Sequence, residues 1–351
     1  MSPGSLSSDV RPAAGEGSGP LRLGLVGCGY QGNCLATAAI RTDVVRLVAC
    51  ADPDPGALAR VAGLVPDLST HPSLEALLEE AEVDAVLVAT PNHLLCPLSL
   101  VAMGAGKHVL AEKPIGLNQE EGATLEAVAE KAGARFMAGY SMRFSVAGRV
   151  HELLSAGLVG EIQAITGHFA CGPLDHGWVA SPETGGGPLL FLGSHLVDMV
   201  LWFAGDDVVD VSGHIRRRAG IEIDETSTFE IRFAGGAVAQ CMVAQGLSSF
   251  SFTVEIHGRD GRVSLRGHNF LQYEVEVVSK VNSAYAQPTV LRPYVDRDHI
   301  TMMLVPELEE FAGAIAERRP PSIDATDGRR VLQVLDAVVA SDRSGAPVLL
   351  S

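Results

Sequence analysis

The sequence lacks any apolar run long enough to cross a bilayer, although 47% of its 351 residues are apolar. A membrane-spanning helix needs about 20 consecutive apolar residues, so we expect no membrane-spanning protein. The first twenty residues also lack the basic start and the sustained apolar stretch of a signal peptide. Their content of Ser, Gly, Pro and Ala predicts a disordered tail over residues 1–20.

Paired cysteines and metal-ligand spacings are also absent. The six cysteines are scattered without a CxxC pair, and the histidines outside the motifs described below show no mutual spacing. We therefore expect no metal site. Cysteines in apolar segments are best interpreted as small core residues, which is consistent with a reducing cytoplasm.

Positive charge is scarce, because 26 Lys and Arg residues stand against 42 Asp and Glu residues and the net charge is −16. This excess of negative charge opposes binding to nucleic acid or to an anionic membrane. An anionic cofactor can bind only where local dipoles overcome the overall field.

Short apolar strands alternate with helical segments between residues 21 and 140. We expect strands at 21–26, 44–50, 83–89, 107–111 and 135–139, with helices at 30–40, 74–78, 98–105 and 120–131. This alternation predicts a doubly wound parallel sheet with right-handed connections.

After residue 140 the pattern changes to a helix at about 146–157 followed by long alternating segments. Strands are expected at 161–170, 208–217, 226–233, 236–245, 250–257 and 261–266. Residues 226–233 and 237–243 flank Gly235-Gly236 and predict a hairpin. The region 141–351 is therefore expected to form a second α+β domain with an open, mostly antiparallel sheet. Helices at 304–317 and 329–341 would close it.

A glycine motif follows the first strand. Gly27, Gly29 and Gly32 form a GxGxxG pattern, and Asp52 lies twenty residues after Gly32 at the end of the next strand. Glycines in this position allow a tight turn, and the helix that follows offers N–H groups to a pyrophosphate. Asp52 would accept hydrogen bonds from the adenosine ribose and favour NAD over NADP. The other interpretation is a glycine-rich turn beside a surface aspartate.

Two further segments end predicted strands. Thr90, Pro91, Asn92 and His93 close the third strand, where they could line a ligand crevice or only form a turn. Glu112, Lys113 and Pro114 follow the fourth strand. A lone lysine is usually a solvated surface charge. A lysine partly desolvated beside a nicotinamide would instead have a lowered pKa suited to proton transfer.

Together these segments resemble the Gfo/Idh/MocA family of oxidoreductases, which includes glucose–fructose oxidoreductase and inositol dehydrogenase. The matching stretches are residues 27–32, 89–92, 105–114, 139–144, 157–162 and 185–198. The resemblance implies a Rossmann domain over 21–140 and a substrate-binding domain over 141–351, with C-terminal helices returning toward the first. It further implies NAD or NADP, a sugar, cyclitol or polyol substrate, and a homodimer or homotetramer built on the second sheet. In this family the Lys-Pro bond is often cis.

The resemblance also assigns residues to the site. The nucleotide would contact residues 27 and 29–32 (including Tyr30 and Gln31), together with Asp52, residues 90–93, Glu112 and Lys113. The substrate would contact Lys113, Tyr140, Arg143, His176, Trp178, Phe191, His195 and Asp198. Trp178 and His176 belong to a loop, where a tryptophan could also be a hydrophobic cover.

If residues 187–203 form one helix, Phe191, His195 and Asp198 share a face. A histidine and a carboxylate one turn apart could hydrogen-bond and bind vicinal hydroxyls, although His195 could also be a core histidine. Relatives carry an aspartate one turn before the histidine, where this chain has Phe191. The phenylalanine would make the pocket more apolar or stack on a sugar face.

These observations predict an NAD(P)-dependent oxidoreductase that interconverts a secondary alcohol and a ketone. Lys113 would be the general acid/base, while His195 and Asp198 would position the substrate or relay the proton. Two alternatives remain. One is a glycosidase that uses bound NAD as a transient oxidant, as some relatives do. The other is a non-catalytic NAD-binding sensor, which the presence of Phe191 would favour.

Overall fold

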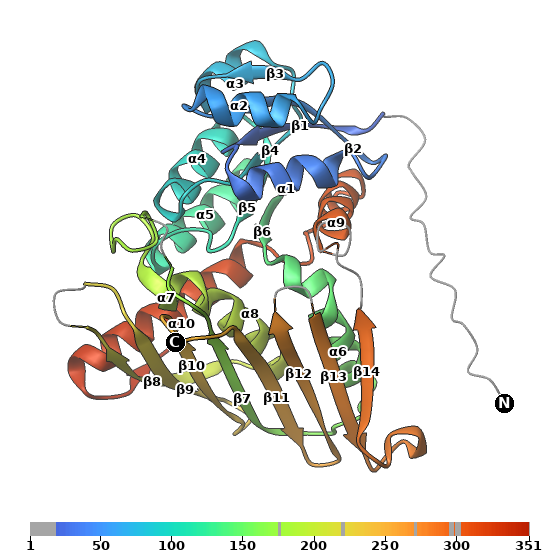
Figure 1. Ribbon diagram of the computed structural model, residues 1–351, viewed down its shortest axis with the longest axis vertical. Helices are drawn as coiled ribbons and strands as arrows, with labels where there is room; N and C mark the ends of the chain where they lie inside the picture. The colour runs from blue at the N-terminus through green and yellow to red at the C-terminus, as the bar shows by residue number, and fades with distance from the viewer. Residues whose placement is uncertain are drawn as a thin grey trace.

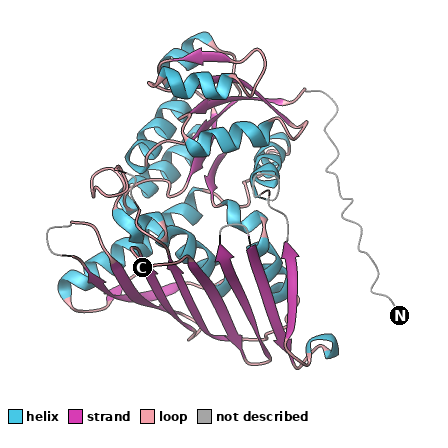
Figure 2. Ribbon diagram, viewed as in Figure 1, coloured by secondary structure: helices cyan, strands magenta, loops and turns pink. Residues whose placement is uncertain are grey.

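The structure is a computed structural model that describes residues 19–174, 177–218, 222–269, 272–294, 298 and 303–350. Within these ranges the chain forms two sheets, one of six strands and one of nine (Figures 1 and 2). Residues 1–18 of the predicted tail lie outside the described residues.

The first sheet is parallel throughout, with strand order β3-β2-β1-β4-β5-β6. Its strands are β1 (Leu21–Val26), β2 (Val45–Ala51), β3 (Ser69–His71), β4 (Ala85–Val88), β5 (His108–Glu112) and β6 (Phe136–Gly139). The order reverses between β1 and β4, and ligands of such sheets bind outside the carboxyl ends of the strands at that point. The predicted doubly wound sheet is confirmed, although the three-residue strand β3 was not expected.

Helices cover both faces of this sheet (Figure 1). One face packs against α1 (Tyr30–Ala39), α2 (Pro55–Ala62) and α9 (Val305–Ala316). The other packs against α3 (Leu74–Glu80), α4 (Asn92–Gly104) and α5 (Gln119–Ala132). Strands β1 and β5 are buried on both sides, which explains their nearly continuous apolar sequences.

The second sheet has the order β14-β13-β12-β11-β7-β10-β9-β8-β15. Its strands are β7 (Ile162–Ala170), β8 (Val208–Arg216), β9 (Thr226–Phe233), β10 (Val238–Ala244), β11 (Ser251–Gly258), β12 (Gly261–Asn269), β13 (Gln272–Ser279), β14 (Thr289–Tyr294) and β15 (Val348–Leu349). Every pairing is antiparallel except that of β7 with β10. The expected open, mostly antiparallel sheet and its β9–β10 hairpin are confirmed.

Helices cover only one face of the second sheet (Figure 2). They are α6 (Val146–Ser155), α7 (Gly187–Phe191), α8 (Gly193–Ala204) and α10 (Ala325–Ser344), and two short 3₁₀ helices, η1 (Ser141–Phe144) and η2 (Ser283–Tyr285), complete the described helical segments. Along β7, Ile165 and Phe169 are buried while Thr166 is exposed, which is the alternation of a sheet with one open face.

Residues 187–203, considered above as one possible helix, form two helices, α7 and α8, which meet at Leu192. The backbone N–H of His195 donates to the carbonyl of Leu192, three residues back, at 3.1 Å. The junction packs closely on the sheet, because a Cβ on Gly193 would lie 3.3 Å from Val243.

The end of the chain links the two sheets. Helix α9 returns to the first sheet, where Leu308 and Phe311 join the core on the α1 side. Helix α10 packs against β8 of the second sheet and α5 of the first. The C-terminal helices therefore hold the carboxyl edge of the first sheet against α7 and α8.

Candidate functional site

The glycine motif forms the turn between β1 and α1. Gly27 has φ +89°, and a Cβ there would lie 2.4 Å from the carbonyl oxygen of Ala89. A Cβ on Gly32 would lie 2.0 Å from the carbonyl oxygen of Gly27, whereas Gly29 faces open space. Only glycine fits the first and third positions, and the open second position allows a ligand to approach the backbone.

Helix α1 begins without a side-chain cap and without an acid in its first turn. Side chains cap the starts of α2, α3, α5 and α10, whereas α4, α6, α7, α8 and α9 are uncapped like α1. Among the uncapped helices, α1 is the one that follows the glycine motif. The first N–H groups of an uncapped helix carry partial positive charge and can bind an anion. This start therefore fits the pyrophosphate of a dinucleotide, despite the net negative charge of the chain.

Asp52 lies beside this turn. One of its carboxylate oxygens accepts from the backbone N–H of Cys28 at 2.7 Å, and the other accepts from that of Asp54 at 2.8 Å. The carboxylate thus lies next to the glycine motif at the end of β2, where the adenosine ribose of a dinucleotide is held in this type of fold.

Residues 90–93 form the turn into α4 and contact a loop that precedes α7. The side-chain amide of Asn92 donates to the carbonyl of Gly185 at 2.9 Å. The backbone N–H of His93 donates to the carbonyl of Thr184 at 3.1 Å. The hydroxyl of Thr90 is buried and has no hydrogen-bond partner. The segment therefore joins the two halves of the site and leaves one polar atom available to a ligand.

Glu112 ends β5 and is only 7% exposed. One carboxylate oxygen accepts from the side-chain amide of Gln31 at 2.6 Å, and the other accepts from the backbone N–H of Lys113 at 3.2 Å. Burial raises the pKa of Glu112, while Lys113 and Gln31 oppose the rise. The Lys113–Pro114 bond is cis, as the family resemblance implied.

The ammonium of Lys113 reaches from the first sheet to α7. Its Nζ lies 3.3 Å from the carbonyl oxygen of Phe191 and 4.3 Å from the centre of the Phe191 ring. Burial lowers the pKa of Lys113 to about 8, although the neighbouring Glu112 opposes this change. A lysine whose pKa is close to neutrality can both donate and accept a proton.

His195 belongs to α8 and lies near Lys113. Burial and the positive charge of Lys113 hold its pKa well below the usual value, so the imidazole is neutral at physiological pH. Its Nδ1 atom is buried without a hydrogen-bond partner. The same is true of the hydroxyl of Tyr140, whose ring meets that of His195 edge-on at 6.4 Å. Unpaired buried polar atoms are costly, and they often indicate that a ligand or water completes the site.

Asp198 does not pair with His195, which corrects one sequence-based expectation. Both of its carboxylate oxygens accept from Arg143, at 2.6–3.1 Å. Arg143 also contacts Asp327 on α10 at 3.2 Å and lies over the ring of Trp202. Burial raises the pKa of Asp198 to about 6 even though Arg143 opposes this. The pair links η1, α8 and α10, so both residues are placed to support the site from behind.

Two other predicted residues lie at the edges of the site. The ring of Trp178 meets that of Phe191 edge-on at 5.8 Å, so the tryptophan packs on the residue that contacts Lys113. Tyr30 is 77% exposed in the first turn of α1. His176 lies outside the described residues.

Sequence reasoning missed one acidic residue. Glu307 on α9 is fully buried, and neither of its carboxyl oxygens has a hydrogen-bond partner. Burial and the neighbouring Glu112 hold its pKa well above the usual value. Glu307 lies in the first turn of its helix, where acids are common for dipole reasons. The sequence therefore carried no signal of its unusual setting.

Among the described residues, no group of three or more His, Cys, Asp and Glu side chains is arranged to hold a metal ion. The uncapped α1, the open space at Gly29 and the unpaired Thr90 hydroxyl fit a dinucleotide instead. Its reactive ring would be expected at the carboxyl edge near Lys113.

Comparison with known proteins agrees with this geometry. A family model described as an oxidoreductase family with an NAD-binding Rossmann fold matches residues 21–140. A second, the GFO/IDH/MocA C-terminal domain, matches residues 148–264. The two models together cover more than half of the chain.

Individual relatives share 30% or less of their sequence with this chain. A 1-carboxy-3-chloro-3,4-dihydroxycyclohexa-1,5-diene dehydrogenase of Comamonas testosteroni is 30% identical over 202 residues, or 56% of this chain and 51% of the relative. This match therefore spans only about half the length of that relative. A 1,5-anhydro-D-fructose reductase of Ensifer adhaerens is 28% identical over 92% of this chain and 97% of the relative.

A solved structure supports the fold. The oxidoreductase domain protein from Kribbella flavida has a TM-score of 0.85 at 23% identity, covering 95% of this chain and 100% of the other. With both family models matched in order along the sequence, the chain belongs to the Gfo/Idh/MocA family of NAD-binding oxidoreductases.

Proposed function

We propose that the protein interconverts a secondary alcohol and a ketone on a sugar, cyclitol or related polyol, with Lys113 as the general acid/base. The observation that carries this proposal is the position of the Lys113 ammonium. It lies at the carboxyl edge of the nucleotide-binding sheet, 3.3 Å from the Phe191 carbonyl of the second domain. The similarity to an anhydrofructose reductase and a dihydroxycyclohexadiene dehydrogenase supports an oxygenated ring as substrate.

The nicotinamide, when bound, supplies or accepts the hydride at the reacting carbon. Lys113 donates a proton to the oxygen on that carbon, or removes a proton from it. In reduction the ammonium donates its proton as the carbonyl oxygen gains negative charge, and in oxidation the neutral amine removes the proton from the hydroxyl. The pKa of about 8 allows both forms near neutral pH.

The other assignments follow from the contacts. We assign the nucleotide to residues 27–32, Asp52, residues 90–93 and the Gln31–Glu112 pair. Neutral His195 would bind a substrate hydroxyl or relay a proton, and Tyr140 would contact the substrate beside it. The ion pair of Arg143 with Asp198 would position α8, which carries His195. Trp178 and His176 would complete the substrate pocket.

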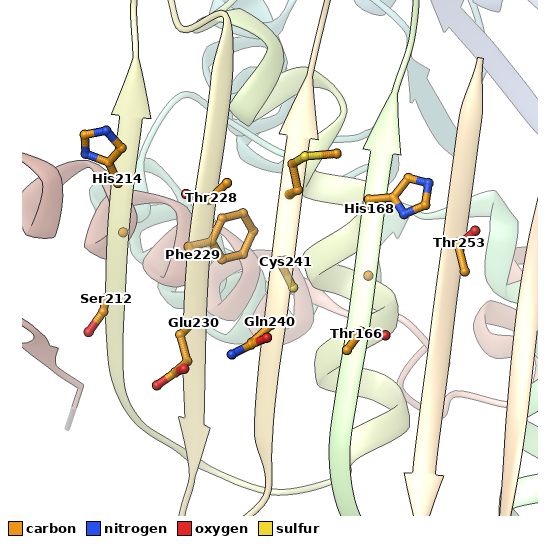
Figure 3. Close-up of a pocket in the computed structure, with 13 residues that line it drawn as sticks. Thr166, His168, Ser212, His214, Thr228, Phe229, Glu230, Gln240, Cys241 and Thr253 are labelled. Atoms are coloured by element: carbon orange, nitrogen blue, oxygen red, sulfur yellow. The ribbon is translucent and has the colours of Figure 1, made fainter. Parts of the chain in front are cut away.

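The open face of the second sheet supports an oligomer. An open groove runs across β7, β8, β9, β10 and β11, and its lining includes Thr166, His168, Thr228, Glu230 and Gln240 (Figure 3). Sheet faces of this size are usually covered by helices or by another subunit. We propose a homodimer or homotetramer that uses this face. Size-exclusion chromatography with light scattering on the wild type and on Thr166→Arg tests it, because a charge at the centre of the face should release monomers.

We also place the protein in the cytoplasm, and the six free, buried cysteines are consistent with a reducing compartment. Among the described helices, none is both long and apolar enough to cross a membrane.

A substrate panel tests the proposed function. Keto-sugars, polyols and cyclitols are each supplied with NAD(H) or NADP(H), and nicotinamide absorbance is followed. Turnover of at least one ring substrate is expected. Sugar release without net change in NADH would indicate a redox-assisted glycosidase. Tight NADH binding without turnover of any member would indicate a sensor.

A further inference from the structure

Phe191 and Trp178 form an aromatic wall beside the proton-transfer group. The Phe191 ring lies 4.3 Å from Nζ of Lys113, and the Trp178 ring meets Phe191 at 5.8 Å with an interplanar angle of 80°. Both side chains are only partly buried, so the wall remains accessible to a ligand. Aromatic rings commonly contact the C–H faces of apolar groups, and they offer no strong acceptor for a hydroxyl.

The wall is held firmly from behind. Both carboxylate oxygens of Asp224 accept from the backbone N–H of Leu189, at 3.1 and 3.0 Å, which anchors α7. A Cβ on Gly187 would lie 2.7 Å from the same carboxylate, so the helix start fits closely against Asp224. On the other side, the hydroxyl of Thr184 donates to the carbonyl of Trp178 at 2.6 Å. The backbone that carries the two rings is therefore anchored on both sides.

No ion pair joins the Lys113 ammonium to a carboxylate within the described part of the chain, although the charge of Glu112 acts on it. The oxygens of Glu112 are occupied by Gln31 and by the backbone N–H of Lys113. The hydrogen-bond partner of Nζ is the carbonyl of Phe191. The rings themselves offer no acceptor, so a hydroxyl placed flat against them, away from the Phe191 carbonyl, His195 and Tyr140, would be desolvated without a partner. This loss costs about tenfold or more in affinity.

An oxygen bound to Lys113 lies about 2.6–3.2 Å from Nζ. A substrate that approaches on the Phe191 side of Nζ, where the ring centre is 4.3 Å away, brings the ring carbon next to the reacting carbon against that ring. Resting on the proposed function, we infer that Phe191 selects substrates with a deoxygenated carbon, a CH₂ group, beside the reacting carbon. The substrate class is thus a deoxy cyclic polyol or deoxy keto-sugar, and Phe191 is its specificity determinant.

The test compares two ring ketones that differ by one hydroxyl. One is a pentahydroxycyclohexanone, and the other is the tetrahydroxycyclohexanone with CH₂ next to the carbonyl. The wild type should show about tenfold or greater kcat/KM for the deoxy ring. Phe191→Leu and Phe191→Asn are near-isosteric with each other, so they differ mainly in polarity. Phe191→Leu should keep the preference, and Phe191→Asn should reduce or invert it. Thermal melts report whether each variant folds.

Equal kcat/KM for the two rings in the wild type, or a preference for the hydroxylated ring, would overturn the inference while leaving the proposed function intact. If the wild type reduces neither ring, calorimetric titration of both ketones into NADH-loaded protein compares their binding affinities instead. Tighter binding of the deoxy ring supports the aromatic wall, whereas equal or weaker binding rejects it. Failure of the proposed function is a separate result, seen as no turnover of any substrate in the wider panel.

Discussion

The ammonium of Lys113 lies 4.3 Å above the ring of Phe191, and the two residues belong to different halves of the molecule. Lys113 follows a strand of the nucleotide-binding sheet, whereas Phe191 ends a helix that packs on the second sheet. The position of the proton-transfer group therefore depends on how the two halves meet. The ring and the carbonyl of Phe191 stabilise the ammonium without a paired carboxylate.

The first prediction concerns pH. Burial lowers the pKa of Lys113 to about 8 from a usual value above 10. Ketone reduction needs the ammonium, so its kcat/KM should be constant below this pKa and fall as pH rises through about 8. Alcohol oxidation needs the amine, so its kcat/KM should rise through the same range. Profiles with no inflection in this range would contradict the assignment.

Cofactor choice gives a second prediction. The carboxylate of Asp52 lies beside the glycine motif through its hydrogen bond to Cys28, and its charge should repel the 2′-phosphate of NADP. Asp52→Asn should shift the ratio of kcat/KM values toward NADPH by about tenfold. Asp54→Asn is a matched control, because the Asp54 side chain caps α2 through Gly56. That control should leave the cofactor ratio unchanged, and an equal shift in both variants would exclude a direct role for Asp52.

The ion pair behind the site gives a third prediction. Asp198 is 1% exposed and accepts three hydrogen bonds from Arg143. Asp198→Asn should leave a buried guanidinium largely unpaired and lower the free energy of unfolding by about 3–5 kcal/mol. Chemical denaturation measures this loss. The exposed Arg149–Glu152 pair is the control, because Glu152→Gln should have much less effect. Similar losses in both variants would show that the buried pair has no special role.

Much of the fold could be predicted because its signals are local. Apolar strands alternating with helices indicated the first sheet, and alternating segments with a Gly-Gly turn indicated the β9–β10 hairpin. Strands β3 and β15 have only three and two residues, too few to show a period. Strand β13 does alternate, as its burial pattern shows, and was overlooked in the sequence.

The site was less predictable, because its decisive contacts join distant parts of the chain. Lys113 and His195 could be identified from motifs, but the hydrogen bond from Lys113 to Phe191 spans 78 residues. Asp198 was expected to face His195 from its helical spacing. Its true partner, Arg143, is 55 residues away and could not be inferred from periodicity. Glu307 had no local signal at all.

The most direct test of the account is turnover by Lys113→Met, measured together with NADH binding. Methionine keeps the length of the side chain but cannot carry a proton, so kcat should fall by about 10²–10⁴-fold. NADH affinity should remain close to that of the wild type. Lys131→Met is the control, because Lys131 is exposed in the last turn of α5 and should retain full activity. Turnover by Lys113→Met at the wild-type rate would contradict the assignment of Lys113 as the general acid/base.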